Sequence, residues 1–508
     1  MKRILAILLA LIMILCSLVA CDQTQDDTNE EESSSTQAAT NNNNTTEPET
    51  DPVKIGNLDP SINLNEKEIN IISSSLVWMK DEVSVETENA DPINDAIYKR
   101  NKDVEKALNV KIKNTLMPVS SMSDDYVIID ELKKTNGPDC PYHLASNNAY
   151  TSFENTHNGY FRNLLDVEHL DLSQDYWAPY YNAGATIGNQ QYFATGSISL
   201  SLRRFIFVTF FNKDLANYYN LENLYDVVNE GRWTLDYQAK IISNMFTEVD
   251  NQSGATEGDT YGFLTDNGIY VDAYIASCDI EILVKDSDDF FVLQPNKEKA
   301  DSMMQKIYNL YWKSGATYVF QRNASYAQFD KIRDKFSSGE ATMITDRLIG
   351  AESEQLKNMD SPYGILPIPK FDDAQKEYYS LAHDLFTVYG IVNSEATDKM
   401  TSDLGAVLEC LAIESERTVK DAYFEVALKG KYSKDAESWE MLDMIIKNLK
   451  INGGLLYTIK LTDITHQFRT AVGNKLRNTE TIFNTQKQAT INIYLKKMQD
   501  EIRKLQNG

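Results

Sequence analysis

The order of hydrophobic and polar positions in the first part of the chain predicts alternating strands and helices. Glu68–Ile72 is a short apolar run that predicts a strand, and the polar run Ser73–Ser75 after it predicts a loop. Asp91–Leu108 carries apolar residues at helical spacing among charged ones, which predicts an amphipathic helix. Val110–Lys113 alternates and predicts a second strand. This succession of strand, helix and strand is typical of an α/β sheet.

Similar elements continue downstream. Cys140–Ala145 follows a Gly-Pro-Asp break and is expected to lead into a loop at Ser146–Asn148. Arg204–Phe211 predicts a buried strand, and Thr234 is expected to cap a helix. Ala341–Thr345 predicts another short strand after a glycine stop.

Two patterns lie near the ends of sheets or domains. Tyr363–Pro369 contains two prolines, so it is expected at a sheet edge or boundary. The last helix carries an apolar stripe at Ile491, Leu495, Met498, Ile502 and Leu505. We expect this stripe to pack against its own domain and the protein to be a monomer, although a short dimeric coiled coil would use the same stripe.

The N-terminus has the pattern of a secretory signal. Two basic residues precede the uncharged stretch Ile4–Ala20, and small residues come just before Cys21. The segment resembles the lipobox of bacterial lipoproteins, which implies cleavage after residue 20, lipidation of Cys21 and an extracytoplasmic protein anchored to the outer face of the membrane. An uncleaved membrane anchor is the alternative.

Composition separates a tether from a folded body. Residues 22–51 contain nine acidic and no basic side chains, so residues 21–65 are expected to form a disordered acidic tether. The chain of 508 residues has a formal net charge of −26, which argues against a nucleic-acid partner. Its length favours at least two lobes. Cys140, Cys278 and Cys410 show no disulfide or metal spacing, and no cofactor is expected.

A series of short motifs in the body resembles one family. In chain order they are Gly137-Pro138-Asp139, Gly159–Leu165, Asn212–Leu215, Trp233-Thr234, Phe336–Met343, Tyr363–Lys370 and Phe468–Val472. Together they are similar to the family 1 extracellular solute-binding proteins, which include maltose-binding protein and sugar-binding lipoproteins of ABC importers.

The resemblance implies an α/β fold of two lobes, periplasmic-binding-protein-like, with a ligand cleft between lobes joined by crossing hinge strands. It implies a body over 66–508, with lobe 1 at about 66–198 and 337–392 and lobe 2 at about 199–336 and 393–508. The expected crossovers are Ile198–Arg204 and Tyr389–Asn393. The implied partners are a small solute, most simply a sugar, and the permease subunits of an importer.

Sugar recognition needs aromatic faces and hydrogen-bonding groups, and open α/β sheets bind ligands beyond their strand ends. The candidate ligand-binding residues are Trp78, Ser146, Asn147, Asn148, Tyr150, Trp177, Asp346, Arg347 and His383. Each has a plainer alternative: core packing for the aromatic residues and His383, turn chemistry for Ser146–Asn148, and a mutual surface ion pair for Asp346 and Arg347. Thr465 and His466 stand where maltose-binding relatives carry an aromatic contact, which argues against maltodextrin-like stacking.

An enzyme and a surface receptor remain alternatives. Seventy-five acidic residues make chance carboxylate pairs unavoidable, so such pairs do not indicate a glycosidase. The sequence has no Gly-x-Ser-x-Gly elbow, no His-Glu-x-x-His and no glycine-rich phosphate loop. We therefore expect a binding protein without catalytic residues or a metal site, and an adhesin or receptor of the same fold is the second possibility.

Overall fold

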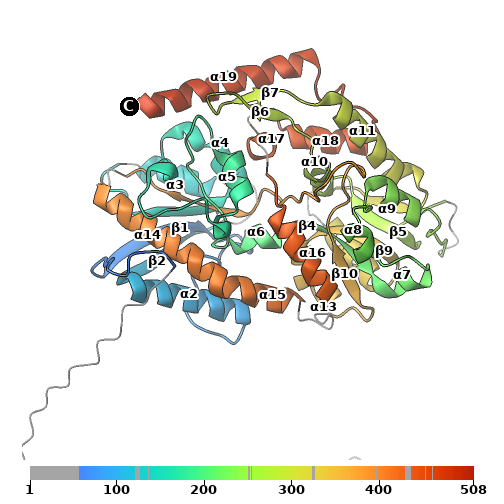
Figure 1. The fold of residues 1–508 in the computed structure, drawn as a ribbon, viewed down its shortest axis with the longest axis horizontal. Coiled ribbons are helices and arrows are strands. Elements are labelled where there is room, and N and C mark those ends of the chain that lie inside the picture. Colours follow the sequence, from blue (N-terminus) through green and yellow to red (C-terminus); the bar gives the residue numbers. More distant parts are fainter. Residues whose placement is uncertain are drawn as a thin grey trace, which may run out of the picture. The chain divides into compact units, whose positions relative to one another are not determined.

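The computed structural model describes residues 56–119, 126–135, 137–249, 252, 254–322, 327–394, 398–428, 436–451, 453–459 and 461–507. Cys21, the expected signal segment and residues 22–55 of the expected tether lie outside these ranges. The described part forms two main sheets, each with its own helices (Figure 1).

The first sheet has four strands in the order β11-β3-β1-β2. Its strands are β1 (Lys67–Ser74), β2 (Val110–Met117), β3 (Leu144–Asn148) and β11 (Thr387–Ile391). β1 is parallel to β2 and β3, with Ile71 opposite Leu144, and β11 is antiparallel to β3. The sheet and its helices are called the first lobe. These helices are α2 (Pro92–Leu108), α3 (Val127–Thr135), α4 (Ala149–Glu154), α5 (Pro179–Ala185), α14 (Asp398–Glu414) and α15 (Lys420–Leu428).

Capping residues define both ends of α2. Asp91 stands before α2 in an extended conformation, and its carboxylate accepts hydrogen bonds from the backbone N–H groups of Ile93 and Asn94 at 2.9 and 3.0 Å. Asn109 ends the helix in the left-handed conformation. The helix packs against α14 and α15, which come from the far end of the sequence (Figure 1).

The second sheet has five strands in the order β10-β4-β9-β5-β8. Its strands are β4 (Phe207–Asn212), β5 (Tyr261–Asp266), β8 (Thr317–Phe320), β9 (Ala341–Arg347) and β10 (Tyr363–Leu366). The sheet and its helices are called the second lobe. These helices are α7 (Lys213–Tyr218), α8 (Leu224–Asn229), α9 (Leu235–Ile242), α10 (Asp272–Ser277), α11 (Lys297–Tyr308), α12 (Gln328–Ser337), α13 (Glu354–Lys357), α16 (Ala436–Lys447) and α18 (Ile464–Gly473). The proline-flanked β10 lies at the sheet edge, as predicted.

Two antiparallel segments carry the chain between the lobes. The first runs from Ala194, which bridges to Tyr389, through α6 (Leu200–Arg204) to Ile206, which bridges to Ala382. The second runs back from Ala382 to β11. The first crossing was predicted at 198–204, but the second lies at about 382–387 and therefore precedes the predicted 389–393, which is largely inside or just after β11.

A buried carboxylate joins the two crossing segments. Glu82, in the loop after β1, accepts hydrogen bonds from the Ser201 backbone N–H at 3.0 Å and from the Thr387 hydroxyl at 2.7 Å. The Ser201 hydroxyl in turn accepts from the Thr387 backbone N–H at 2.8 Å. Burial raises the pKa of Glu82, against the effect of these hydrogen bonds. The hinge is thus built from a first-lobe loop and both crossings.

The lobes also meet away from the hinge. The hairpin of β6 (Leu283–Lys285) and β7 (Phe291–Leu293) projects from the second lobe between α10 and α11. Its turn contacts residues 186–190 of the first lobe: the Gly188 N–H donates to the Asp289 carbonyl at 2.9 Å, and the Asn189 N–H donates to the Asp289 carboxylate at 3.0 Å. The short helix α17 (Gly453–Leu456) packs beside this hairpin and against α4 and α5.

The last helix, α19 (Thr485–Asn507), packs on its own chain through the predicted stripe. Ile491, Leu495, Met498 and Ile502 are buried, whereas Leu505 is exposed. α19 contacts β7 and the 3-10 turn Thr156–Asn158. Within the described residues, no helix is long and apolar enough to span a bilayer.

Four expectations about boundaries and elements need correction. β9 and β10 pair with strands of the second lobe, so 337–366 does not belong to the first lobe. α14 and α15 pack against α2 and therefore belong to the first lobe rather than the second. Residues 56–65 are part of the folded body, because Leu58 and Leu64 are buried in the first-lobe core. Ser146–Asn148 is strand, not loop, because each residue pairs with β11.

Candidate functional site

A small cavity lies between the lobes beside the second crossing. Its walls are Asp272, Leu381, Ala382, His383, Asp384, Phe386, Ile451, Leu455, Leu456 and Thr465. The volume of about 20 Å³ holds roughly one water molecule. A sugar ring does not fit, so a solute can enter here only if the lobes separate.

Phe205 is the aromatic centre of the interlobe region. It lies in the first crossing, and its ring contacts Trp78 of the first lobe edge to face, with centroids 6.0 Å apart. The His383 ring lies 6.1 Å away, and the Arg347 guanidinium lies 5.3 Å above the Phe205 centroid. Three predicted candidates that are far apart in the sequence thus surround one ring.

Four candidates carry buried polar atoms that have no hydrogen-bond partner in the described part of the chain. These atoms are Trp78 Nε1, Asn148 Nδ2, Arg347 Nε and His383 Nδ1. A buried polar group without a partner costs roughly 1–3 kcal/mol. Most buried polar groups in folded proteins have a partner, so these four atoms are candidates for contacts with a bound molecule.

His383 is neutral at physiological pH. Burial, followed by the positive charges of Arg347, Arg469 and Arg322, lowers its pKa well below the usual value. Its Nε2 lies 3.4 Å from the Asp384 carboxylate, which favours the tautomer protonated at Nε2. Nδ1 is then a hydrogen-bond acceptor, able to bind a ligand hydroxyl.

Asn148 is the last residue of β3, and Tyr150 follows two residues later in α4. The Asn148 side-chain oxygen caps α4 by accepting from the Thr151 N–H at 2.9 Å, which leaves its amide nitrogen unused. The Tyr150 N–H donates to the Asp384 carbonyl at 2.9 Å. Burial, together with Asp463 and Asp384, raises the pKa of the Tyr150 hydroxyl to about 12, so it is a permanent donor. Both residues therefore lie close to the second crossing.

The structure places the other candidates in supporting positions. Trp177 is fully buried in the first-lobe core and donates from Nε1 to Glu409 at 2.8 Å, so it does not face the cavity. Ser146 is buried within β3, and Asn147 donates from Nδ2 to the Thr151 hydroxyl at 3.1 Å. Trp177 thus has the core-packing role considered from the sequence, whereas Ser146 and Asn147 are strand residues and not turn residues.

Asp346 and Arg347 do not form the surface ion pair considered from the sequence. The Asp346 carboxylate is fully buried and accepts a two-pronged bond from Arg333, at 2.7 and 3.2 Å. Asp346 therefore positions its neighbours and is not free for a ligand. Arg347 instead lies over the Phe205 ring in the interlobe region.

Sequence reasoning missed Phe205, Asp272 and Arg469. The guanidinium of Arg469 holds the Asp272 carboxylate, one contact measuring 2.9 Å, beside the cavity. The predicted first crossing was the available signal for Phe205, because residues next to a crossing lie at the floor of an interlobe cleft. The Asp272–Arg469 pair spans 197 residues and leaves no local signal.

A further opening lies on the other side of Trp78. This cavity of about 300 Å³ is bounded by the first-lobe segment 77–97, by Arg204 of the crossing and by Glu352 and Lys357 of the second lobe. Arg204 and Glu352 form a bidentate pair, with both contacts at 2.9 Å. The interlobe region thus extends on both sides of Phe205.

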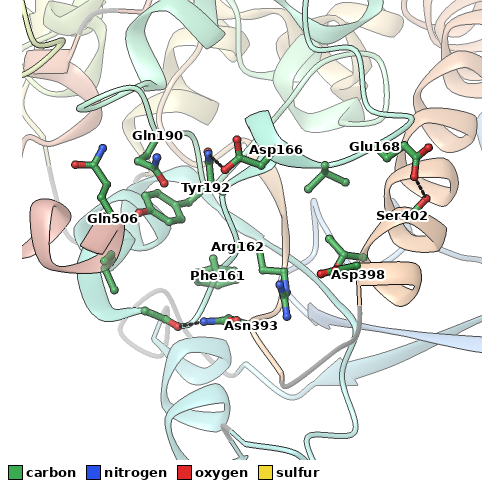
Figure 2. A pocket seen from close by; sticks show the side chains of 15 residues that line it. Phe161, Arg162, Asp166, Glu168, Gln190, Tyr192, Asn393, Asp398, Ser402 and Gln506 are labelled. Atoms are coloured by element: carbon green, nitrogen blue, oxygen red, sulfur yellow. Dashed lines mark hydrogen bonds between the residues drawn. The ribbon is translucent and has the colours of Figure 1, made fainter. Parts of the chain in front are cut away.

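A larger cavity lies elsewhere, with a volume of about 670 Å³ (Figure 2). Its walls come from the segment 159–168, from the last turn of α19 and from Gln190, Tyr192, Asn393, Asp398, Thr401 and Ser402. Ser402 donates to Glu168 at 2.8 Å across one side. None of its lining residues belongs to the second sheet, and two of them, Leu505 and Gln506, come from α19.

The described residues contain no group of three His, Cys, Asp or Glu side chains placed to hold a metal ion. Cys278 and Cys410 are buried and Cys140 is partly buried, all three as free thiols.

Comparison with known proteins identifies the fold. No family model and no curated protein matches the sequence. Among solved structures, a family 1 extracellular solute-binding protein from Bifidobacterium longum subsp. infantis is 12% identical, covers 87% of this chain and 100% of its own, and has a TM-score of 0.50. A cyclo/maltodextrin-binding protein complexed with maltotetraose is 13% identical over 86% of this chain and 97% of its own, with a TM-score of 0.51.

An uncharacterized protein from Listeria monocytogenes is 11% identical over 86% of this chain and 100% of its own, with a TM-score of 0.53. The predicted two-lobed fold is confirmed.

Proposed function

We propose, from the fold shared with family 1 extracellular solute-binding proteins, that this chain captures a carbohydrate between its lobes and delivers it to an ABC importer. One observation supports this above all. The unpartnered polar atoms of Trp78, Asn148, Arg347 and His383 come from both lobes and from the crossing between them. A ligand that satisfies them must contact both lobes at once, and such a ligand favours the closed arrangement.

Aromatic and polar groups are combined as sugar binding requires. Trp78 and Phe205 supply ring faces and edges for the C–H side of a sugar. The neutral His383, the Asn148 amide and the Tyr150 hydroxyl supply acceptors and donors for hydroxyls. A bound saccharide would replace the missing hydrogen bonds.

The proposal extends to the membrane. A lipid on Cys21 would hold the body near importer permeases, with residues 22–55 as the acidic tether. Metabolic labelling with an alkyne fatty acid tests this part, because Cys21→Ala should abolish labelling of the protein.

Ligand binding is tested by thermal unfolding with a panel of mono- and oligosaccharides. A ligand at 100 times its Kd should raise the stability of the protein by about 2.7 kcal/mol. Trp78→Ala should weaken binding roughly 10- to 100-fold, through loss of a buried aromatic contact. Trp312→Ala is the matched control, because Trp312 is also partly buried but lies in the second lobe at the end of α11. Stabilisation by peptides alone would refute the carbohydrate assignment.

An enzyme is the second candidate, because His383, Asp384 and Asp272 border one cavity. Asp272 is held by Arg469, which leaves a single carboxylate beside a neutral histidine. Chromatography of any bound saccharide after prolonged incubation separates the two functions: an intact ligand supports capture, and cleavage products support hydrolysis.

A further inference from the structure

Arg347 is a partly buried cation, and no carboxylate of the described residues lies within ion-pair distance of its guanidinium. Its guanidinium lies between two rings, 5.3 Å from the Phe205 centroid and 4.9 Å from the Phe329 centroid. Among the described residues, its side chain makes no ion pair and no hydrogen bond, and its Nε is buried without a partner. Burial lowers the pKa of Arg347, although not enough to neutralise an arginine.

The adjacent carboxylate does not compensate this charge. Asp346 accepts from Arg333 Nε and NH2 at 2.7 and 3.2 Å and from the Tyr270 hydroxyl at 2.8 Å. Its Oδ1 also accepts from the backbone N–H of Arg347 itself, not from the guanidinium. Asp346 is therefore hydrogen-bonded to Arg333, which also pairs with Asp330 at 3.6 Å, and it makes no direct contact with the Arg347 guanidinium.

The other carboxylates nearby are also engaged. Asp272 is paired with Arg469. Asp266 accepts from the backbone N–H groups of Gly268 and Tyr270 and from the Gln328 side chain. No described carboxylate thus contacts the Arg347 guanidinium directly, although the charges of Asp346 and Asp266 act on it from a distance.

Arg347 also lies beside the aromatic ring that two other candidates contact. It shares Phe205 with Trp78 and His383, whose unpartnered nitrogens belong to the same interlobe region. Of the unpartnered groups, the Trp78 N–H, the Asn148 amide and Arg347 are all donors. This excess of donors beside a desolvated cation favours an acceptor-rich anionic group over a neutral hydroxyl.

We infer that the solute is an acidic saccharide and that Arg347 binds its carboxylate. The inference rests on the proposed function and narrows it from carbohydrates in general to uronic-acid-containing ones. The planar guanidinium offers a carboxylate two parallel N–H donors, which a neutral hydroxyl cannot match. A carboxylate would also supply the counter-charge that the protein omits.

Paired probes test the inference on the full-length protein. Isothermal titration compares oligogalacturonides and oligomannuronates with the same oligosaccharides after chemical reduction of their carboxyl groups. The acidic form of at least one pair should bind roughly 10- to 100-fold more tightly than its reduced form, the range expected for a charged hydrogen-bonded contact.

Variants of Arg347 assign the contact. Arg347→Gln should remove this preference, so that acidic and reduced probes bind alike, whereas Arg347→Lys should retain part of it. Arg477→Gln is the matched control, because Arg477 also stacks on a ring, that of Tyr308, at 3.9 Å, and should leave the preference unchanged. Unliganded Arg347→Gln should be at least as stable as the wild type, because it removes an uncompensated charge.

The outcomes separate the inference from the function on which it rests. Equal or tighter binding of the reduced probes, or of other neutral saccharides alone, overturns the acidic-saccharide inference and leaves carbohydrate capture standing. An equal loss of affinity for both probes in Arg347→Gln also overturns it, because Arg347 would then bind hydroxyls. Absence of binding by every saccharide overturns both.

Discussion

At the scale of single residues, Asp266 is a buried carboxylate of the second lobe with a shifted pKa. The residue ends β5 and is fully buried, with no cation in hydrogen-bond reach among the described residues. Burial raises its pKa from 3.8 to about 6, against the hydrogen bonds from Tyr270, Gln328 and Gly268. The folded protein therefore binds a proton here more tightly than the unfolded chain does.

This shift predicts how stability depends on pH. The stabilisation from protonated Asp266 is complete below pH 3.8 and is lost as pH rises through about 6. Asp266→Asn should remove this dependence. Its amide can donate to the Gln328 side-chain oxygen, which has no partner in the described structure.

Between pH 4.5 and 7 the stability of the variant relative to the wild type should rise by about 2 kcal/mol. Urea unfolding at several pH values measures this difference, with exposed Asp214→Asn as control. Parallel pH profiles for wild type and Asp266→Asn would show that Asp266 does not titrate in this range.

The sequence could predict some site residues because of their place after strands. Trp78 and Asn148 come at or just after the ends of β1 and β3, and His383 precedes β11. The direction in which each side chain points could not be predicted. Trp177 points toward Glu409, and Asp346 points toward Arg333 on a neighbouring helix. Those pairings are set by tertiary packing, which a local pattern does not contain.

At the scale of elements, α14 depends on one glycine. Gly405 lies in the middle of this helix, where a Cβ would stand 2.2 Å from the Glu168 carbonyl oxygen and 2.6 Å from the Val167 side chain. The helix thus touches the backbone of residues 167–168 directly. A glycine at this point costs helix propensity and permits the contact.

Gly405→Ala should destabilise the protein by roughly 1–3 kcal/mol, although alanine favours an exposed helix by about 1 kcal/mol. The clash involves a backbone atom that cannot rotate away. Gly473→Ala in α18 is the control, because its Cβ would meet the end of the Asn267 side chain at 3.0 Å, which can move. Denaturant unfolding compares the free energies of unfolding of the two variants. Similar values would show that α14 moves away from residues 167–168 without cost.

Element types followed from the sequence better than their limits. The amphipathic pattern and Asp91 identified α2, and Thr234 caps α9 as predicted, accepting from the Tyr237 N–H at 3.1 Å. β3 extends through the polar residues Ser146–Asn148 because β11 pairs with them. Pairing with a strand about 240 residues away in the sequence overrides the turn propensity of Ser146–Asn148.

At the scale of the whole molecule, which lobe an element joins was the hardest feature to predict. The apolar run Ala341–Thr345 identifies a strand but not its partner, and β9 lies between β4 and β5. α14 returns to the first lobe after the chain has built most of the second. Lobe membership depends on contacts between distant segments, so order along the chain does not determine it.

We expect the turn of the β6–β7 hairpin to help hold the two lobes together. Asp289 has a left-handed backbone with φ of 63°, pairs with Lys285 at 2.7 Å and accepts from the Asn189 N–H. Asp289→Gly keeps the backbone conformation accessible and removes both side-chain contacts. A loss of about 1–2 kcal/mol would shift the ratio of closed to open protein by roughly 5- to 30-fold.

Small-angle X-ray scattering should then show a larger radius of gyration for unliganded Asp289→Gly. Asp288→Gly is the matched control, because it removes the same charge from the same turn without a contact to 186–190. An unchanged scattering profile of Asp289→Gly would mean that the hairpin does not hold the lobes together.

The contact between this hairpin and residues 186–190 also sets a limit on speed. If the proposed ligand enters at the cavity of about 20 Å³ beside the second crossing, the hairpin contact has to break first, because a sugar ring does not fit there. The binding rate would then grow in proportion to solute concentration when this is low. At high concentration it would reach a plateau equal to the opening rate of the hairpin contact, so the turn at Asp289 would gate entry of the ligand.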